Sequence, residues 1–87
     1  MAKVEIYTSP LCGFCHAAKR LLDHKGIEFE EFDVMFKPSL KKEMMARAEG
    51  RQTVPQIFID DTGIGGCDEL NTLEASGKLD AMLSTGQ

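Results

Sequence analysis

Apolar positions in the first part of the chain follow two different periods. The run from Lys3 to Thr8 is rich in β-branched and aromatic residues, which predicts a strand. From Cys15 to Leu22 apolar residues recur at helical spacing, which predicts a helix with one buried face. Lys25-Gly26 is expected to end this helix, with the glycine in a left-handed cap. The residues expected on its buried face are Phe14, Ala18, Leu21 and Leu22.

The middle of the chain repeats this alternation of strand and helix. Apolar and acidic residues alternate between Ile27 and Val34, which predicts a second strand. Pro38 suits the first turn of a second helix, and Gly50 closes it. The positions expected to be buried on that helix are Leu40, Met44, Met45 and Ala48.

The last third predicts a hairpin followed by helix. Val54 to Asp60 has strand composition, Asp61-Thr62-Gly63 predicts a tight turn, and Ile64-Gly65 a short return strand. A third helix is expected to start at Cys67. It should break at Ser76-Gly77, and one or two further helical turns should finish the chain.

The resulting order of elements is β-α-β-α-β-β-α, which belongs to the α/β class. A β-α-β unit implies a parallel strand pair joined by a right-handed crossover. The hairpin adds antiparallel pairing, so we expect a four-stranded mixed sheet with helices on both faces. A functional site is then expected at the carboxyl end of the first strand.

Length and charge restrict the class of protein. The chain has 87 residues, which predicts a single domain over residues 1–87. Its 14 acidic residues outnumber the 10 basic ones, and no basic tract is present, so nucleic acid is not an expected partner. No apolar run reaches membrane-spanning length and no signal peptide is recognised, so no membrane partner is expected. Three cysteines without spaced pairs favour a reducing cytoplasm over a secreted disulfide scaffold.

The pair in Cys12-Gly13-Phe14-Cys15 follows the first strand and opens the first helix. A cysteine at a helix N-terminus faces unsatisfied N–H groups and the positive end of the helix dipole, which favour a thiolate. A second thiol three positions later can resolve a mixed disulfide, so the motif predicts a redox site. Half of a zinc site is the alternative; zinc needs four ligands, and only His16 and Cys67 could complete the set.

Two further motifs join the cysteine pair. These are Thr53-Val54-Pro55 and Gly65-Gly66-Cys67-Asp68. With the order of elements, they make the chain resemble a glutaredoxin of the short dithiol type over essentially its whole length. The resemblance implies a thioredoxin-like fold and glutathione-dependent reduction of disulfides. It implies that Cys12 is the nucleophile and Cys15 the resolving thiol, with Gly13 and Phe14 forming the active-site loop.

The resemblance also implies where glutathione binds. Pro55 would be cis, and Val54 would pair with the cysteinyl part of glutathione. Asp68, at a helix start, would receive the α-ammonium group, although a carboxylate there also suits the helix dipole alone. Arg51 could hold a carboxylate or be a solvated loop charge. The implied glutathione-binding residues are Arg51, Gln52, Thr53, Val54, Pro55, Gly66, Cys67 and Asp68.

The chain departs from the family pattern at two places. Gly13-Phe14 stands where the family often carries Pro-Tyr, and Ser9 stands where many members have lysine. A small residue after the first cysteine also occurs in glutaredoxins that bridge a [2Fe–2S] cluster between two protomers, using that cysteine and glutathione. The alternative function is therefore cluster binding through Cys12. The expected partners are glutathione and disulfide or glutathionylated proteins. The chain is expected to be a monomer, and a dimer only around a cluster.

Overall fold

A mixed sheet of four strands forms the centre of the computed structural model, which describes residues 2–84. Its strands lie in the order β2-β1-β3-β4. β1 pairs in parallel with β2, whereas β1–β3 and β3–β4 are antiparallel. This confirms the predicted mixed sheet. The strands are β1 (Val4–Thr8), β2 (Glu30–Asp33), β3 (Gln56–Ile59) and β4 (Thr62–Gly65).

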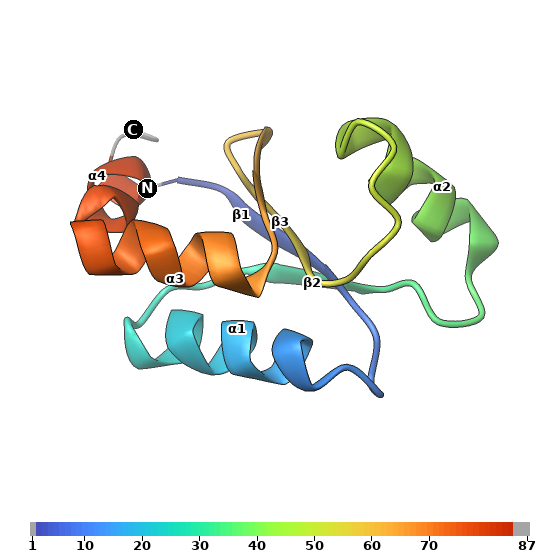
Figure 1. Ribbon diagram of the computed structural model, residues 1–87, viewed down its shortest axis with the longest axis horizontal. Coiled ribbons are helices and arrows are strands. Elements are labelled where there is room, and N and C mark those ends of the chain that lie inside the picture. The colour runs from blue at the N-terminus through green and yellow to red at the C-terminus, as the bar shows by residue number, and fades with distance from the viewer. Residues whose placement is uncertain (1, 85–87) are drawn as a thin grey trace.

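Helices cover both faces of this sheet, as predicted. α1, α3 and α4 pack on one face and α2 on the other (Figure 1). Gly26 and Gly77 follow α1 and α3 with φ of 72° and 78°, which confirms the predicted glycine ends of both helices. The helices are α1 (Gly13–His24), α2 (Pro38–Arg47), α3 (Cys67–Ser76) and α4 (Lys78–Ser84). Among residues 2–84, no helix is long and apolar enough to span a bilayer.

The side chains of β1 point alternately to the two faces of the sheet and so contribute to two separate core clusters. Val4 and Ile6 face α1, where they pack with Ala18 and Leu22. Tyr7 faces the opposite side and packs with Phe58 beneath Met44 of α2. Successive side chains of a strand point to opposite faces, so one fully buried strand supplies both clusters. Leu40, expected in the α2 cluster, is only half-buried.

Arg47 attaches α2 to the sheet. Its guanidinium donates to the Glu5 carboxylate at 2.9 Å and to the Tyr7 hydroxyl at 2.9 Å. It also lies 4.1 Å from the centre of the Phe58 ring. Tyr7 in turn donates to Glu43 at 2.6 Å, and burial together with that carboxylate raises the pKa of Tyr7. Because Glu5 is 7% exposed, this arginine supplies the main partner for a buried charge.

The hairpin turn differs from the predicted one. The turn lies at Asp60 and Asp61, with φ of 50° and 67°, and β4 begins directly at Thr62. Two successive residues with positive φ match the twist of the flanking strands in a two-residue hairpin, and aspartate tolerates that conformation. The expected turn at Asp61-Thr62-Gly63 was therefore one residue too late, and the return strand is longer than Ile64-Gly65.

Phe14 does not belong to the core. Its side chain is 66% exposed, although helical spacing placed it on the buried face of α1. The helix begins at Gly13, and its buried residues are Cys15, Ala18 and Leu22. Phe14 precedes Cys15 by one position, which on a helix turns its side chain about 100° away from that of Cys15. The buried face of α1 is therefore centred on Cys15, Ala18 and Leu22, and Phe14 lies at its margin.

The two ends of the described residues meet beside the start of β1, whereas the cysteine motif follows the end of that strand. The Ala2 N–H donates to the carbonyl of Leu83 at 3.3 Å. Nearby, Lys25 at the end of α1 binds Glu74 of α3 at 2.8 Å and Asp80 of α4 at 2.6 Å. These carboxylates raise the pKa of Lys25, with Asp80 the larger cause.

Candidate active site

The cysteine pair lies where β1 passes into α1. Cys12 is the residue that caps α1, and its Sγ accepts a hydrogen bond from the Cys15 N–H at 3.2 Å. The same thiol donates to the Val54 carbonyl at 3.5 Å. Cys12 is half-buried, whereas Cys15 is completely buried. Only Cys12 of the pair is therefore accessible to a disulfide from outside.

The environment of Cys15 keeps it protonated. Burial, followed by its hydrogen bond with Cys12, raises the pKa of Cys15 to about 12. A backbone hydrogen bond from Ser9 and the charge of Lys19 oppose this increase. At neutral pH Cys15 is thus held as a thiol, which suits a group that reacts second rather than first.

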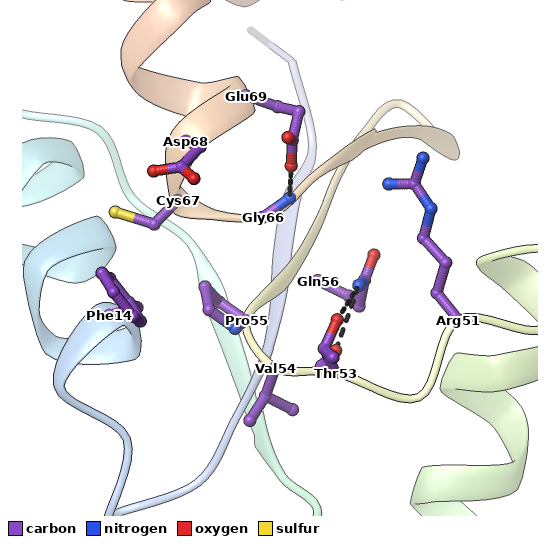
Figure 2. Close-up of a pocket in the computed structure, with 10 residues that line it drawn as sticks. All are labelled: Phe14, Arg51, Thr53, Val54, Pro55, Gln56, Gly66, Cys67, Asp68 and Glu69. Carbon is purple, nitrogen blue, oxygen red and sulfur yellow. Dashed lines mark hydrogen bonds between the residues drawn. The ribbon is translucent and has the colours of Figure 1, made fainter.

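A cleft of about 320 Å³ lies beside Cys12. This volume is at the lower end of the range for small-molecule sites, roughly 300–1,000 Å³. Its floor is the Thr53-Val54-Pro55 segment, and the Val54–Pro55 peptide bond is cis, as the resemblance implied. Figure 2 shows Phe14 and Arg51 on opposite sides of this segment, with Asp68 near the start of α3.

The start of α3 closes one side of the cleft. Gly66 precedes the helix, and its N–H donates to the Glu69 carboxylate at 2.6 Å. A Cβ at Gly66 would lie 3.2 Å from the Pro55 carbonyl oxygen, so glycine allows these two segments to approach closely. Asp68 is exposed on the first turn. A helix start with free N–H groups favours a carboxylate ligand.

Residues 4–64 match the glutaredoxin family model. The chain belongs to the glutaredoxin family. It is 52% identical over 83 residues to glutaredoxin 3 of Escherichia coli strain K12, covering 95% of this chain and 99% of that one. As a glutaredoxin it is a thiol–disulfide oxidoreductase with a thioredoxin-like fold.

Solved glutaredoxin structures superpose on it closely. The solution structure of glutaredoxin from Brucella melitensis has a TM-score of 0.86 and is 52% identical, over 100% of this chain and 94% of that one. The crystal structure of a buckwheat glutaredoxin–glutathione complex has a TM-score of 0.86 at 27% identity, over 95% of this chain and 77% of that one. The expected fold is confirmed.

The cleft of this glutaredoxin contains most of the residues that the sequence singled out. Gln52 is an exception, because it does not line the cleft. The cysteine pair lies beside the cleft rather than in its lining. The predicted glutathione-binding residues in the lining are Arg51, Thr53, Val54, Pro55, Gly66, Cys67 and Asp68.

Three lining residues were not predicted to bind glutathione. Phe14 forms one side of the cleft. Gln56 holds the loop in place, because its side-chain amide donates to the Thr53 carbonyl at 3.0 Å. Glu69 binds the Gly66 N–H. The glutamate three positions after a helix-capping residue is a recognisable capping signal, so Glu69 could have been found from the sequence.

Cys67 occupies a different environment from the pair. It is 8% exposed, and its Sγ accepts a hydrogen bond from the Asn71 side chain at 3.4 Å. Its sulfur points toward the side of the cleft on which Phe14 lies (Figure 2). Within residues 2–84, no group of three or more His, Cys, Asp and Glu side chains is placed to hold a metal ion.

Proposed function

We propose that this glutaredoxin uses glutathione to reduce protein disulfides and glutathione mixed disulfides. The observation that carries the proposal is the hydrogen bond between Cys12 and the Val54 carbonyl beside a cleft. A reactive sulfur next to exposed strand-like backbone suits a cysteine-containing peptide, which can pair with Val54 as an added strand. The buckwheat relative crystallised with glutathione supports this ligand.

The charges around the cleft suit the two ends of glutathione. Asp68 would receive the α-ammonium of the γ-glutamyl group, while the N–H groups at the start of α3 bind its carboxylate. Arg51, on the far side of Val54 and Pro55, would hold the glycine carboxylate, for which a guanidinium is well shaped. Thr53 and Pro55 shape the floor, and Gly66 and Cys67 the wall.

The chemistry begins at Cys12. Its thiolate attacks the glutathione sulfur of a glutathionylated protein, forming a Cys12–glutathione disulfide, and the protein thiolate leaves with the electron pair. A second glutathione thiolate then attacks the bound glutathione sulfur, which frees Cys12 and releases glutathione disulfide. With a protein disulfide, Cys15 attacks Cys12 instead and releases the fully reduced protein; two glutathiones then reduce the Cys12–Cys15 disulfide.

A coupled assay tests this function. Glutathione, glutathione reductase and NADPH are supplied with a glutathionylated peptide or a protein disulfide, and NADPH oxidation is followed for wild type, Cys12→Ser and Cys15→Ser. Cys12→Ser should abolish turnover of both substrates. Cys15→Ser should preserve deglutathionylation and reduce protein-disulfide turnover. Activity retained in Cys12→Ser would rule out the proposed nucleophile.

Cluster binding is the second candidate function, and Gly13 favours it. A Cβ at Gly13 would have no neighbour within 4 Å, so the space next to Cys12 is open. A [2Fe–2S] cluster needs four ligands. Because Cys15 is completely buried, each protomer would supply Cys12 alone, and glutathione would supply the others. Anaerobic reconstitution with iron, sulfide and glutathione should then yield a coloured dimer, and a colourless monomer would exclude this function.

A further inference from the structure

A cluster of polar side chains lies beside Cys15 and outside the cleft. The Thr8 hydroxyl donates to Glu31 Oε2 at 2.7 Å, and Lys19 Nζ donates to the same oxygen at 2.9 Å. Thr8 is 1% exposed, whereas the Lys19 and Glu31 side chains are 23% and 37% exposed. A buried hydroxyl therefore fixes the inner end of an ion pair that reaches the surface.

The position of Lys19 brings its charge to Cys15. Lys19 follows Cys15 by four residues on α1, so the two side chains lie on the same face of the helix. The positive charge lowers the pKa of Cys15 against the larger effect of burial. Glu31, whose carboxylate binds this ammonium, carries the opposite charge on the same side of Cys15.

We propose that Lys19 and Glu31 are positioning residues with opposite effects on the resolving step: Lys19 promotes the attack of Cys15 on a mixed disulfide at Cys12, and Glu31 restrains it. The proposal rests on the dithiol route of the proposed function. It adds to that route two residues that touch neither glutathione nor the reacting sulfurs.

The other ionisable groups near Cys15 come from α1 and α3. Cys12 caps α1 and is hydrogen-bonded to Cys15. His16 is exposed on α1, and its ring is hydrogen-bonded to the Pro10 carbonyl at 3.0 Å. α3 packs on α1 and begins with Cys67 and Asp68. β1 presents the neutral Ile6 and Thr8 to this face, and β3 is preceded by the neutral Pro55. None of these groups needs to change to test the ion pair.

The charge affects a defined chemical step. Cys15 loses its proton to solvent, and its thiolate attacks Cys12 Sγ. The Cys12–Cys15 bond forms while the bond from Cys12 to the outer sulfur breaks, and the outer thiolate leaves with the electron pair. Lowering the pKa of a thiol increases the fraction present as thiolate but makes that thiolate a weaker nucleophile. The two effects partly cancel, so a tenfold change in thiolate population changes the rate by only about threefold.

The test uses 5,5′-dithiobis(2-nitrobenzoic acid) and the reduced full chain, without glutathione. Cys12 attacks this disulfide and releases one thionitrobenzoate at a rate proportional to reagent concentration. Cys15 then displaces the second thionitrobenzoate at a rate independent of reagent concentration. Absorbance follows both phases across a range of pH. Cys15→Ser identifies the second phase by its loss, and any reaction of Cys67 would depend on reagent concentration.

Lys19→Met should slow the second phase about threefold below the pKa of Cys15, and Glu31→Gln should accelerate it about threefold. Arg20→Met removes the same charge from the exposed neighbouring position on α1 and should leave this phase unchanged. A merely structural role would move both variants in the same direction. A change in the same direction in both variants would overturn the proposal. So would no change in either variant, or an effect of Arg20→Met as large as that of Lys19→Met.

The same traces separate this proposal from the proposed function. Loss of the first phase in wild type would contradict Cys12 as nucleophile and would overturn both. A normal first phase with a second phase insensitive to Lys19 and Glu31 would overturn only the role of the ion pair. This assay contains no glutathione. If the coupled assay showed that the protein does not use glutathione, the measured effects of Lys19→Met and Glu31→Gln on the second phase would therefore still hold.

Discussion

The Sγ of Cys12 accepts a hydrogen bond from the backbone N–H of Cys15 at 3.2 Å. One sulfur atom is thus both the proposed nucleophile and the cap of α1. The first turn of the helix is held by the atom that reacts, and the resolving thiol lies on that same turn. Chemistry at Cys12 and the stability of the helix start are therefore coupled.

Removing this cap should destabilise the protein. Cys12→Ala leaves the Cys15 N–H without its side-chain acceptor, and loss of a helix cap costs about 0.5–2 kcal/mol. Cys12→Ser retains an acceptor and should cost less. Urea unfolding of the reduced proteins gives both values. Equal losses in the two variants would mean that the sulfur does not stabilise the helix start.

Replacing Asp68 should weaken glutathione binding with little effect on the chemical step. Asp68→Asn keeps the shape but loses the charge that would pair with the ammonium of glutathione. We expect the KM for glutathione to rise about tenfold, equivalent to about 1.4 kcal/mol, with kcat nearly unchanged. Asp23→Asn, an exposed carboxylate on α1, is the matched control. If Asp68→Asn left the KM for glutathione unchanged, Asp68 would not bind the ammonium of glutathione, and its charge would serve only the helix dipole.

Arg47→Met should lower stability substantially. The substitution removes the main cation paired with the buried Glu5 carboxylate, and breaking a buried ion pair costs about 3–5 kcal/mol. The lower end is expected because Lys3 remains 3.9 Å from Glu5. Adding Glu5→Gln removes the unpaired charge and should recover part of the loss. A double variant less stable than Arg47→Met would contradict this explanation.

Glu31 should contribute stability that is lost in acid. Burial opposes its ionisation, but hydrogen bonds from Lys19 and Thr8 outweigh it, so the pKa of Glu31 lies below its ordinary value of 4.5. A lowered folded-state pKa means that the contribution is present above 4.5 and disappears as pH falls through the folded-state value. The advantage of wild type over Glu31→Gln should be about 1 kcal/mol or less near neutral pH, because the pair is partly exposed.

Urea midpoints of both proteins, measured from neutral to acidic pH, test the role of Glu31. The difference between them should shrink toward zero at the acidic end. Glu28→Gln, at an exposed position just before β2, provides the control and should show no such pH-dependent difference. A difference that grows in acid would reverse the expected sign.

Local patterns predicted the elements, but not the contacts between distant elements. Strand composition, glycine caps and proline at a first turn depend on neighbouring residues, so the order of elements and the cysteine pair at the strand–helix junction were predictable. The exposure of Phe14 depends on which face of α1 packs on the sheet, and helical spacing was equally consistent with a face containing Phe14 or one containing Cys15. The Arg47–Glu5 pair joins residues 42 positions apart, and no local signal connects them.

The site was predictable to a similar extent. Spacing singled out Cys12 and Cys15, and the resemblance to the family singled out Pro55 and Asp68, which line the cleft beside Cys12. The ion pair between Lys19 and Glu31 was not predicted, because an unremarkable lysine on a helix and an acidic residue on a strand give no pattern. It becomes visible only when the fold brings Lys19 of α1 to Glu31 of β2.

The contact between Ala2 and Leu83 also affects how this domain can be attached to others. β1 runs from that contact toward the cysteine motif, and its five residues span about 17 Å. A fusion partner, a surface tether or a circularly permuted join at the ends would emerge on the side away from Cys12. Such attachments should leave access for large folded substrates open, so the domain is suited to modular reuse.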